Sequence, residues 1–286
     1  MATTTAADLT AGQIAMVGEA RYTYEHQSVS VNTFTKYTLG AGDKSRFIPK
    51  FGGVTAKDLT DGIDMTEAQS LTITGTTHVT DEAGCKVIIT KKLRSQLKED
   101  AYRAAGKVIG NAMGRKIDQD GLALYSGLNS GLGVAGNTFS MDYLLAAVTQ
   151  CWGQAEPVPQ PMAVVIHPHT YHNIQNLISV PATGLQYPDG YQMEYLKNYY
   201  RGTDKLWGCP IFIDGNISID SSDDAYGAIY SKEAFIYLVG WEPENWVEED
   251  KSLRGWEIGI VADYACVEED GTYGRYLLFD AAKPTS

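Results

Sequence analysis

The sequence predicts an α+β fold, and three observations lead to this expectation. β-Forming segments dominate residues 33–92. A helical pattern takes over from Leu93 to about Tyr125, where apolar or small residues recur three or four positions apart. The last section, 255–282, returns to a β pattern. Strands and helices that occur in separate blocks are typical of α+β proteins.

Composition narrows the class of protein. The chain has 286 residues, 44% of them hydrophobic, and a formal net charge of −12. This length allows one large domain or two small ones. The acidic balance argues against a dedicated nucleic-acid-binding protein, because phosphate binding needs concentrated Lys and Arg. The 18 Tyr residues suit either interfaces or an ordinary β core.

The sequence carries no targeting signal that we recognise. The first fifteen residues lack a basic start and an apolar run, and no stretch approaches the length of a membrane span. Cys85, Cys151, Cys209 and Cys266 are far apart and form no CxxC pair. Such scatter predicts reduced thiols in a protein that is made in the cytosol, without a disulfide frame or zinc site.

The first part of the chain predicts two projecting segments. Residues 1–32 are polar and weakly periodic, so we expect an extended arm that needs a neighbour to order it. RFIPKF (46–51) predicts a strand, and SLTITGTTHVT (70–80) predicts its returning partner, followed by a DEAG turn and the strand KVIIT. The polar stretch between 46–51 and 70–80 is long for a compact domain. We therefore expect it to project and to find its partner on another molecule.

The helical segment has an unusual glycine pattern. Gly106, Gly110 and Gly114 recur every four residues, although each Gly costs about 1 kcal/mol against Ala in a helix interior. We expect another backbone or strand to pack closely along this stripe. The helix ends in a Gly-rich linker, 127–137, which is a natural domain boundary.

Residues 138–239 predict a mixed α/β unit. Ser140 is placed to cap a helix that a Pro-rich turn at 157–161 follows. MAVVI predicts a buried strand, HPHTYHNIQNLI a second helix, and a Gly-, Tyr- and Pro-rich loop separates it from later strands. The predicted strands are 209–214, 226–231 and 235–240, followed by a long hairpin of two strands over 255–282 with the turn EEDGTYG.

Candidate chemical sites are weak. GLGVAG (131–136) matches GxGxxG, but a helix precedes it where a dinucleotide fold needs a strand, so a linker is favoured. His167, His169 and His172 have no nearby acidic residue to complete a metal shell, and a strand-to-helix corner at Pro168 explains them better. No GxSxG elbow or Cys–His pair is present. We therefore expect no catalytic, cofactor-binding or metal-binding residues, and no enzyme.

Charge is distributed unevenly. Residues 86–116 hold nine basic side chains against Glu99 and Asp100, and an acidic run lies at 242–250 with Trp241 and Trp246 interleaved. Both could be solvated faces. Alternatively, the basic stretch of one copy binds the acidic patch of a neighbouring copy, or it binds genomic nucleic acid.

The order of parts resembles one family, the major capsid proteins of tailed bacteriophages, whose fold is named after the phage Hong Kong 97. The segments that carry the likeness are LRSQLKEDAYRAAGKVIGNAMGRKIDQDGLALYSGL (93–128), VVIHPHTYHNIQNL (164–177) and IGIVADYACVEEDGTYGRYLLFDAA (258–282). The first looks like the spine helix of the family, with an Arg–x–x–Asp turn at Arg115 and Asp118. The other two look like the strand-to-helix corner of the axial domain and the strands that return to the peripheral domain.

The resemblance implies a division of the chain. It consists of an N-terminal arm (1–32), an extended loop with flanking strands (33–92), a peripheral domain with the spine helix (93–134), an axial α/β domain (135–235) and peripheral return strands (236–286).

It also implies partners and a location. We expect hexamers and pentamers in an icosahedral virion head that is assembled in the host cytoplasm around double-stranded DNA, with the projecting loop over the adjacent subunit. A portal and a separate scaffolding protein are expected, and a decoration protein is an option; no membrane is involved. In some relatives a loop Lys is crosslinked to a neighbour's Asn, but we do not expect this of Lys50 or Lys57.

Other hypotheses stay open at this point. An encapsulin-like cellular compartment would contain cargo enzymes and no DNA. A small-molecule enzyme using 131–136 or the His cluster would bind nucleotide or metal as a monomer. A carbohydrate-binding module would use the many Tyr and Trp residues.

Overall fold

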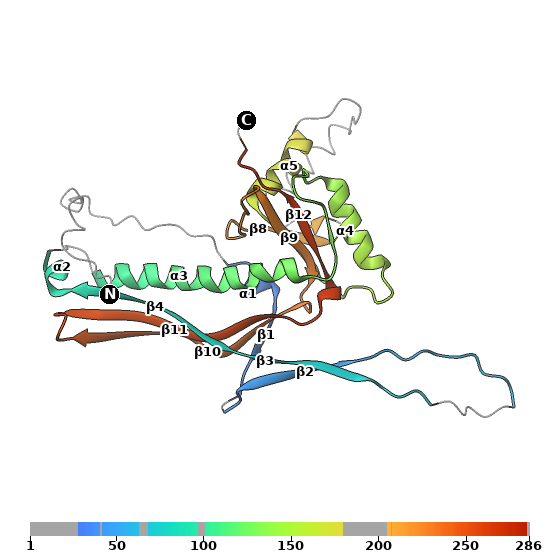
Figure 1. Ribbon diagram of the computed structural model, residues 1–286, viewed down its shortest axis with the longest axis horizontal. Helices are drawn as coiled ribbons and strands as arrows, with labels where there is room; N and C mark the ends of the chain where they lie inside the picture. Colours follow the sequence, from blue (N-terminus) through green and yellow to red (C-terminus); the bar gives the residue numbers. More distant parts are fainter. Residues whose placement is uncertain are drawn as a thin grey trace.

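The computed structural model describes residues 28–40, 42–62, 68–96, 101–179, 205–206 and 208–284. Three sheets and a few helices build it (Figure 1). Most of the predicted arm, 1–27, and the tip 63–67 lie outside these residues, as does the whole loop predicted at 181–203. No helix in the described ranges has the length and apolarity needed to cross a membrane.

A long four-stranded sheet and one long helix form the first body. The sheet order is β1 (Thr35–Thr38), β10 (Phe235–Asp250), β11 (Gly255–Glu268) and β4 (Asp81–Thr90). β10, β11 and β4 are antiparallel, whereas β1 pairs parallel with β10. α3 (Ala101–Ala123) lies along this sheet in Figure 1 and buries Ile109, Met113 and Ile117 against it.

The helical prediction is met in part. α2 (Lys91–Gln96) precedes α3, and 97–100 lie outside the described residues. The short 3₁₀ helix η3 (Leu124–Gly127) ends the segment near the predicted Tyr125. The expected close packing on the glycine stripe is wrong for a single chain, because no described atom lies within 4 Å of a Cβ placed at Gly106, Gly110 or Gly114.

The second body is a six-stranded sheet with two helices packed on one face. Its order is β5 (Gly131–Leu132), β12 (Gly274–Asp280), β9 (Asp224–Ser231), β6 (Met162–Ile166), β8 (Cys209–Ile213) and β7 (Lys205–Leu206). α4 (Met141–Gly153) and α5 (Pro168–Ser179) cover it, as Figure 1 shows. Apolar side chains from both helices and from the central strands form one buried cluster, which includes Leu144, Ile174 and Phe279. Ser140 occupies the N-cap position of α4, but its side chain makes no capping hydrogen bond, contrary to expectation.

Two strand predictions are wrong. The C-terminal strands do not form a hairpin: β11 pairs with β10 and β4, whereas β12 joins β9 and β5 in the other sheet. The 3₁₀ helix η4 (Gly271–Tyr273) carries the chain between the two sheets. The predicted DEAG turn is the start of β4, because residues 81–84 pair in register with β11.

The end of the predicted arm is anchored on its own chain. α1 (Ser30–Thr33) packs on α3, where a Cβ at Gly121 would lie 2.6 Å from the Ser30 side chain. Phe34 is buried in the core beside Tyr230 and Phe235. Residues 28–34 are therefore part of the subunit core rather than part of a free arm.

Candidate functional site

The projecting hairpin is the feature that distinguishes this molecule from a self-contained domain. It consists of β2 (Ser45–Phe51), β3 (Ile73–Val79) and the described parts of the long connection between them. Figure 1 shows it extending away from both sheets. This confirms the strands expected at 46–51 and 70–80.

The strand register gives the hairpin two chemically different faces. Residues that are directly opposite in an antiparallel pair point to the same side, and neighbours along a strand point to opposite sides. The pairs Arg46–His78, Ile48–Thr76 and Lys50–Thr74 therefore form one side, which we call the polar face. The apolar face holds Phe47, Pro49, Phe51, Ile73 and Val79.

The polar face is attached to the subunit itself. His78 is buried, and its Nε2 lies 2.9 Å from Glu269 Oε2. Lys50 pairs with Asp270 and lies over the Tyr273 ring, and Arg46 stacks on Tyr37. These contacts hold the hairpin against η4 and β1.

The Lys50–Asp270 pair shifts both pKa values. The hydrogen bond to Asp270 raises the pKa of the Lys50 amine. Burial alone would raise the pKa of Asp270, but hydrogen bonds from Lys50 and Thr272 outweigh it and lower that pKa below its usual value. Both groups therefore stay charged at neutral pH. An ammonium held this way is a poor nucleophile, and the absence of a crosslink at Lys50 stays a prediction.

The apolar face has no partner within the described part of the chain that would bury it. Phe47, Phe51 and Ile73 keep 55%, 59% and 58% of their surface exposed. Gly75 lets the Phe47 ring lie across the strand, because a Cβ at this position would meet the ring at 2.5 Å. The connection adds three more exposed apolar side chains: Val54, Leu59 and Leu71. An apolar surface of this kind marks an interaction site.

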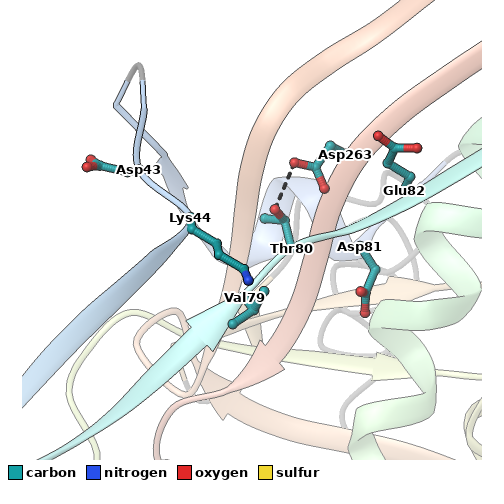
Figure 2. Close-up of a pocket in the computed structure, with 7 residues that line it drawn as sticks. All are labelled: Asp43, Lys44, Val79, Thr80, Asp81, Glu82 and Asp263. Carbon is teal, nitrogen blue, oxygen red and sulfur yellow. Dashed lines mark hydrogen bonds between the residues drawn. The ribbon is translucent and has the colours of Figure 1, made fainter.

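The foot of the hairpin borders an acidic hollow. Figure 2 shows it lined by Asp43, Lys44, Val79, Thr80, Asp81, Glu82 and Asp263. Thr80 Oγ1 donates to Asp263 Oδ2 at 2.8 Å and partly satisfies this carboxylate. Within the described residues, no group of three or more His, Cys, Asp or Glu side chains is placed to hold a metal ion.

The charged segments noted in the sequence meet inside one chain. β4 and β10 flank β11, so Lys86 pairs with Glu257 and Lys91 with Glu249, each at 2.9 Å. Lys36 also pairs with Glu242. The basic stretch and the acidic run thus meet within one chain at Lys91, the first residue of α2, and Glu249 of β10, which the sequence did not indicate.

The His cluster lies at the strand-to-helix corner between β6 and α5, as expected. His169 N–H donates to the His167 ring at 3.1 Å, and His169 Nδ1 lies 2.9 Å from the Ala281 carbonyl oxygen. Because a carbonyl only accepts, His169 Nδ1 carries the proton. These two histidines connect the corner to the end of β12.

The GLGVAG segment has a packing role. Gly131 and Leu132 form β5, which pairs with β12 in parallel. A Cβ at Gly131 would meet the Tyr276 ring at 2.2 Å, and one at Gly133 would meet the Leu278 carbonyl oxygen at 2.3 Å. Close strand packing explains Gly131 and Gly133, whereas Gly136 has a positive φ of 78° and no neighbour within 4 Å. The linker expected here includes a short strand.

With the fold and the hairpin in view, the class is clear: the chain has the fold of phage capsid proteins. It is similar to a chain from Mycobacterium phage Che8, with a TM-score of 0.73 and 14% identity over 93% of this chain and 96% of that one. The capsid of cyanophage P-SCSP1u gives a TM-score of 0.69 and 13% identity over 94% and 93%.

The head of Helicobacter pylori bacteriophage KHP40 gives a TM-score of 0.71 and 10% identity over 92% of this chain and 94% of that one. No protein-family model and no curated protein sequence matches the chain. The likeness therefore lies in the fold.

Proposed function

We propose that this chain is the major capsid protein of a tailed bacteriophage, whose copies self-assemble into an icosahedral head around double-stranded DNA. One observation carries the proposal: on a phage-capsid fold, the projecting hairpin turns its polar face to its own subunit and its apolar face outward. A monomeric protein would be expected to have the reverse arrangement.

Energetics support a second copy as the partner of the hairpin. An isolated two-stranded hairpin is marginally stable in water, and only its polar face is attached to the subunit. Covering a half-exposed Phe stabilises a complex by about 1 kcal/mol or more. Phe47, Phe51 and Ile73 together would favour docking on a neighbour, repeated at every subunit contact.

We propose that the two bodies are the peripheral and axial domains of this family. α3 would be the spine helix and the β2–β3 hairpin the extended loop. Sheet pairing favours one change to the division expected from the sequence: β12, at 274–280, belongs with the axial strands rather than with the peripheral return strands. Residues 236–268 fit the peripheral assignment because β10 and β11 lie under α3.

The wider assembly is part of the same proposal. Hexamers and pentamers, a portal, a scaffolding protein, packaged DNA and assembly in the host cytoplasm are what this class implies. An encapsulin-like compartment is the alternative, and the similar structures named above, which come from phages, do not favour it. Purified particles would distinguish the two, since a compartment would contain cargo enzymes.

The test is electron microscopy of the full-length chain, produced alone and with a candidate scaffolding protein. We expect uniform closed particles. The informative variant is Phe47→Asp with Phe51→Asp, which places charge on the apolar face and should abolish particles while the subunit still folds.

Thr76→Asp is the matched control. It adds charge to the opposite face of the same hairpin at an exposed position and should leave particles intact. Wild-type protein that stays monomeric under both conditions would contradict the proposed function. Particles that form equally well from the Phe47/Phe51 variant would contradict the role of the apolar face.

A further inference from the structure

Three segments that are distant in sequence meet at one buried point. They are the first described residues, Ser28–Ser30, the helix α3 at Asp118, and the loop after β8 at Asp214–Asn216. Asp118 is 0% exposed and Asp214 is 1% exposed. Two carboxyl groups thus lie together at the junction of the two sheets and the chain's N-terminal segment.

Asp118 accepts an unusual number of hydrogen bonds. Its Oδ1 accepts from the Ser28 hydroxyl, the Val29 and Ser30 backbone N–H groups and the Ser30 hydroxyl, at 2.8–3.0 Å. Its Oδ2 accepts from the Asn216 side-chain amide at 2.9 Å. This is the environment of an ionised carboxylate.

Asp214 has the opposite environment. Its Oδ1 accepts from Asn216 N–H at 2.8 Å, but its Oδ2 is buried and has no donor within the described part of the chain. Asn216 donates to both residues, through its backbone N–H to Asp214 Oδ1 and through its side-chain amide to Asp118 Oδ2, so the two buried carboxyl groups are neighbours. Neighbouring carboxyl groups can hydrogen-bond to each other only when one of them carries a proton, because ionised carboxylates only accept.

We propose that Asp118 and Asp214 share one proton, and that this acid pair is a pH-dependent lock joining residues 28–30 to α3 and to the loop after β8. With the proton present, Asp214 donates to Asp118 and the pair carries a single negative charge. Loss of the proton places two negative charges side by side in a buried site and weakens the junction.

The pKa directions agree with this assignment of the proton. Burial, followed by the hydrogen bond with Asp118, raises the pKa of Asp214 to about 7. Burial would also raise the pKa of Asp118, but hydrogen bonds from Asp214, Asn216 and Ser30 outweigh it and lower that pKa. Environments that drive two pKa values apart identify the donor and the acceptor of a pair.

The sign of the pH dependence follows from linkage. Asp214 has a raised pKa in the folded protein, so its stabilising contribution is complete below its unfolded value near 3.8 and is lost as pH rises to about 7. Asp118 has a lowered pKa, so its contribution is lost only when pH falls below its ordinary value. Between about pH 5 and about pH 7, Asp214 therefore controls the trend.

The surrounding titratable groups do not remove this effect. Tyr125 from η3 and Tyr230 from β9 lie close enough to feel both carboxyl groups, and burial raises the pKa of each. Cys266 from β11 faces Asp118, and burial likewise raises its pKa, to about 12. His167 is the other titratable residue near the pair, because it follows Ile166 in the chain and the Ile166 carbonyl oxygen accepts a hydrogen bond from the Asp214 backbone N–H at 3.1 Å.

The test is hydrogen–deuterium exchange of the full-length protein across this pH range, reported as protection of the segment 28–34. In wild type, protection should fall about tenfold per pH unit on approach to about 7 and then level off. Asp214→Asn replaces the acid with a neutral donor of the same shape. It should give a flat profile, with protection at about pH 8.5 no lower than that of wild type at about pH 5.5.

Asp142→Asn is the matched control, because Asp142 is an exposed carboxyl of the same body at the start of α4. It should titrate like wild type. Infrared spectroscopy of wild type gives an independent reading if Asp214→Asn fails to fold: the band of a protonated carboxyl group should be present near pH 5.5 and absent near pH 8.5.

A flat wild-type profile without that infrared band would overturn the lock. So would an Asp214→Asn protein that loses protection with pH as wild type does. Neither measurement depends on particle formation, so the lock and the proposed capsid function can fail separately.

Discussion

The projecting hairpin and the six-stranded sheet use β-structure in opposite ways. In the sheet, α4 and α5 cover the strands, and Phe279, Leu144 and Ile174 are almost fully buried. In the hairpin, the side that contacts the subunit carries Arg46, Lys50 and His78, while the phenylalanines face outward. Within the described residues, the sheet buries its apolar side chains inside one chain, whereas the hairpin leaves its phenylalanines exposed.

This difference separates folding from assembly. Residues that stabilise the subunit are concentrated in the two cores, whereas residues that should stabilise contacts between subunits are on the hairpin. Substituting the hairpin residues should therefore change the free energy of unfolding of the isolated chain only slightly. Substitutions in the two regions should therefore affect different measurements.

The largest effect on folding should come from the sheet. Phe279→Ala removes a fully buried ring that packs on Phe139 and Tyr143, and we expect a loss of about 3–5 kcal/mol in the free energy of unfolding. Denaturant unfolding measures it. Phe47→Ala on the hairpin should change the same quantity by no more than about 0.5 kcal/mol. Equal losses would mean that the hairpin is part of the folding core.

Gly75→Val should distort the hairpin without unfolding the body. A Cβ at this position would lie 2.4 Å from the Ile48 carbonyl oxygen and 2.5 Å from the Phe47 ring, so the ring and the strand pairing must shift. We expect a local cost of about 1–3 kcal/mol and loss of assembly. Hydrogen exchange of the 45–51 amides measures the first effect, and electron microscopy measures the second. Gly53→Ala, which has no atom within 4 Å, is the control and should assemble normally.

Asp270→Asn should loosen the foot of the hairpin by about 1 kcal/mol or less, because the Lys50 amine is partly exposed. The lowered pKa of Asp270 fixes the sign: its contribution is present above the ordinary value of 3.8 and is lost as pH falls below it. Exchange of the hairpin amides should therefore accelerate at acidic pH in wild type but not in Asp270→Asn. Similar acid profiles for both proteins would exclude Asp270 as the group that titrates.

The smallest effect concerns covalent crosslinking. Because the Lys50 amine is held as an ammonium by Asp270, particles boiled in detergent should run as single chains on a denaturing gel. A ladder of multimers that disappears in Lys50→Arg would refute this assignment.

The sequence predicted the elements better than their pairing. β-Forming residues bounded by turn signals were enough to indicate the strands near 46–51 and 70–80, and i, i+3, i+4 spacing was enough to indicate the helix that includes α3. The partner of β12 could not be predicted, because neighbouring strands in sequence usually pair and η4 carries this one to the other sheet.

The site was predicted less completely. The projection of the hairpin followed from its long polar connection, but its inverted faces needed the register that places His78 beside Glu269. Asp118 was noticed as part of an Arg–x–x–Asp turn. Its contacts with Ser30 and Asn216 span 88 and 98 positions, and short-range patterns carry no signal for such contacts.

The central claim is that the outward face of the hairpin is completed by a second copy of this chain. Cryo-electron microscopy of the assembled protein tests it most directly. We expect Phe47, Phe51 and Ile73 to be buried against an adjacent subunit, with Lys50 still paired to Asp270 of its own chain. A particle in which these three side chains stay open to solvent, or fold back on their own subunit, would contradict the account.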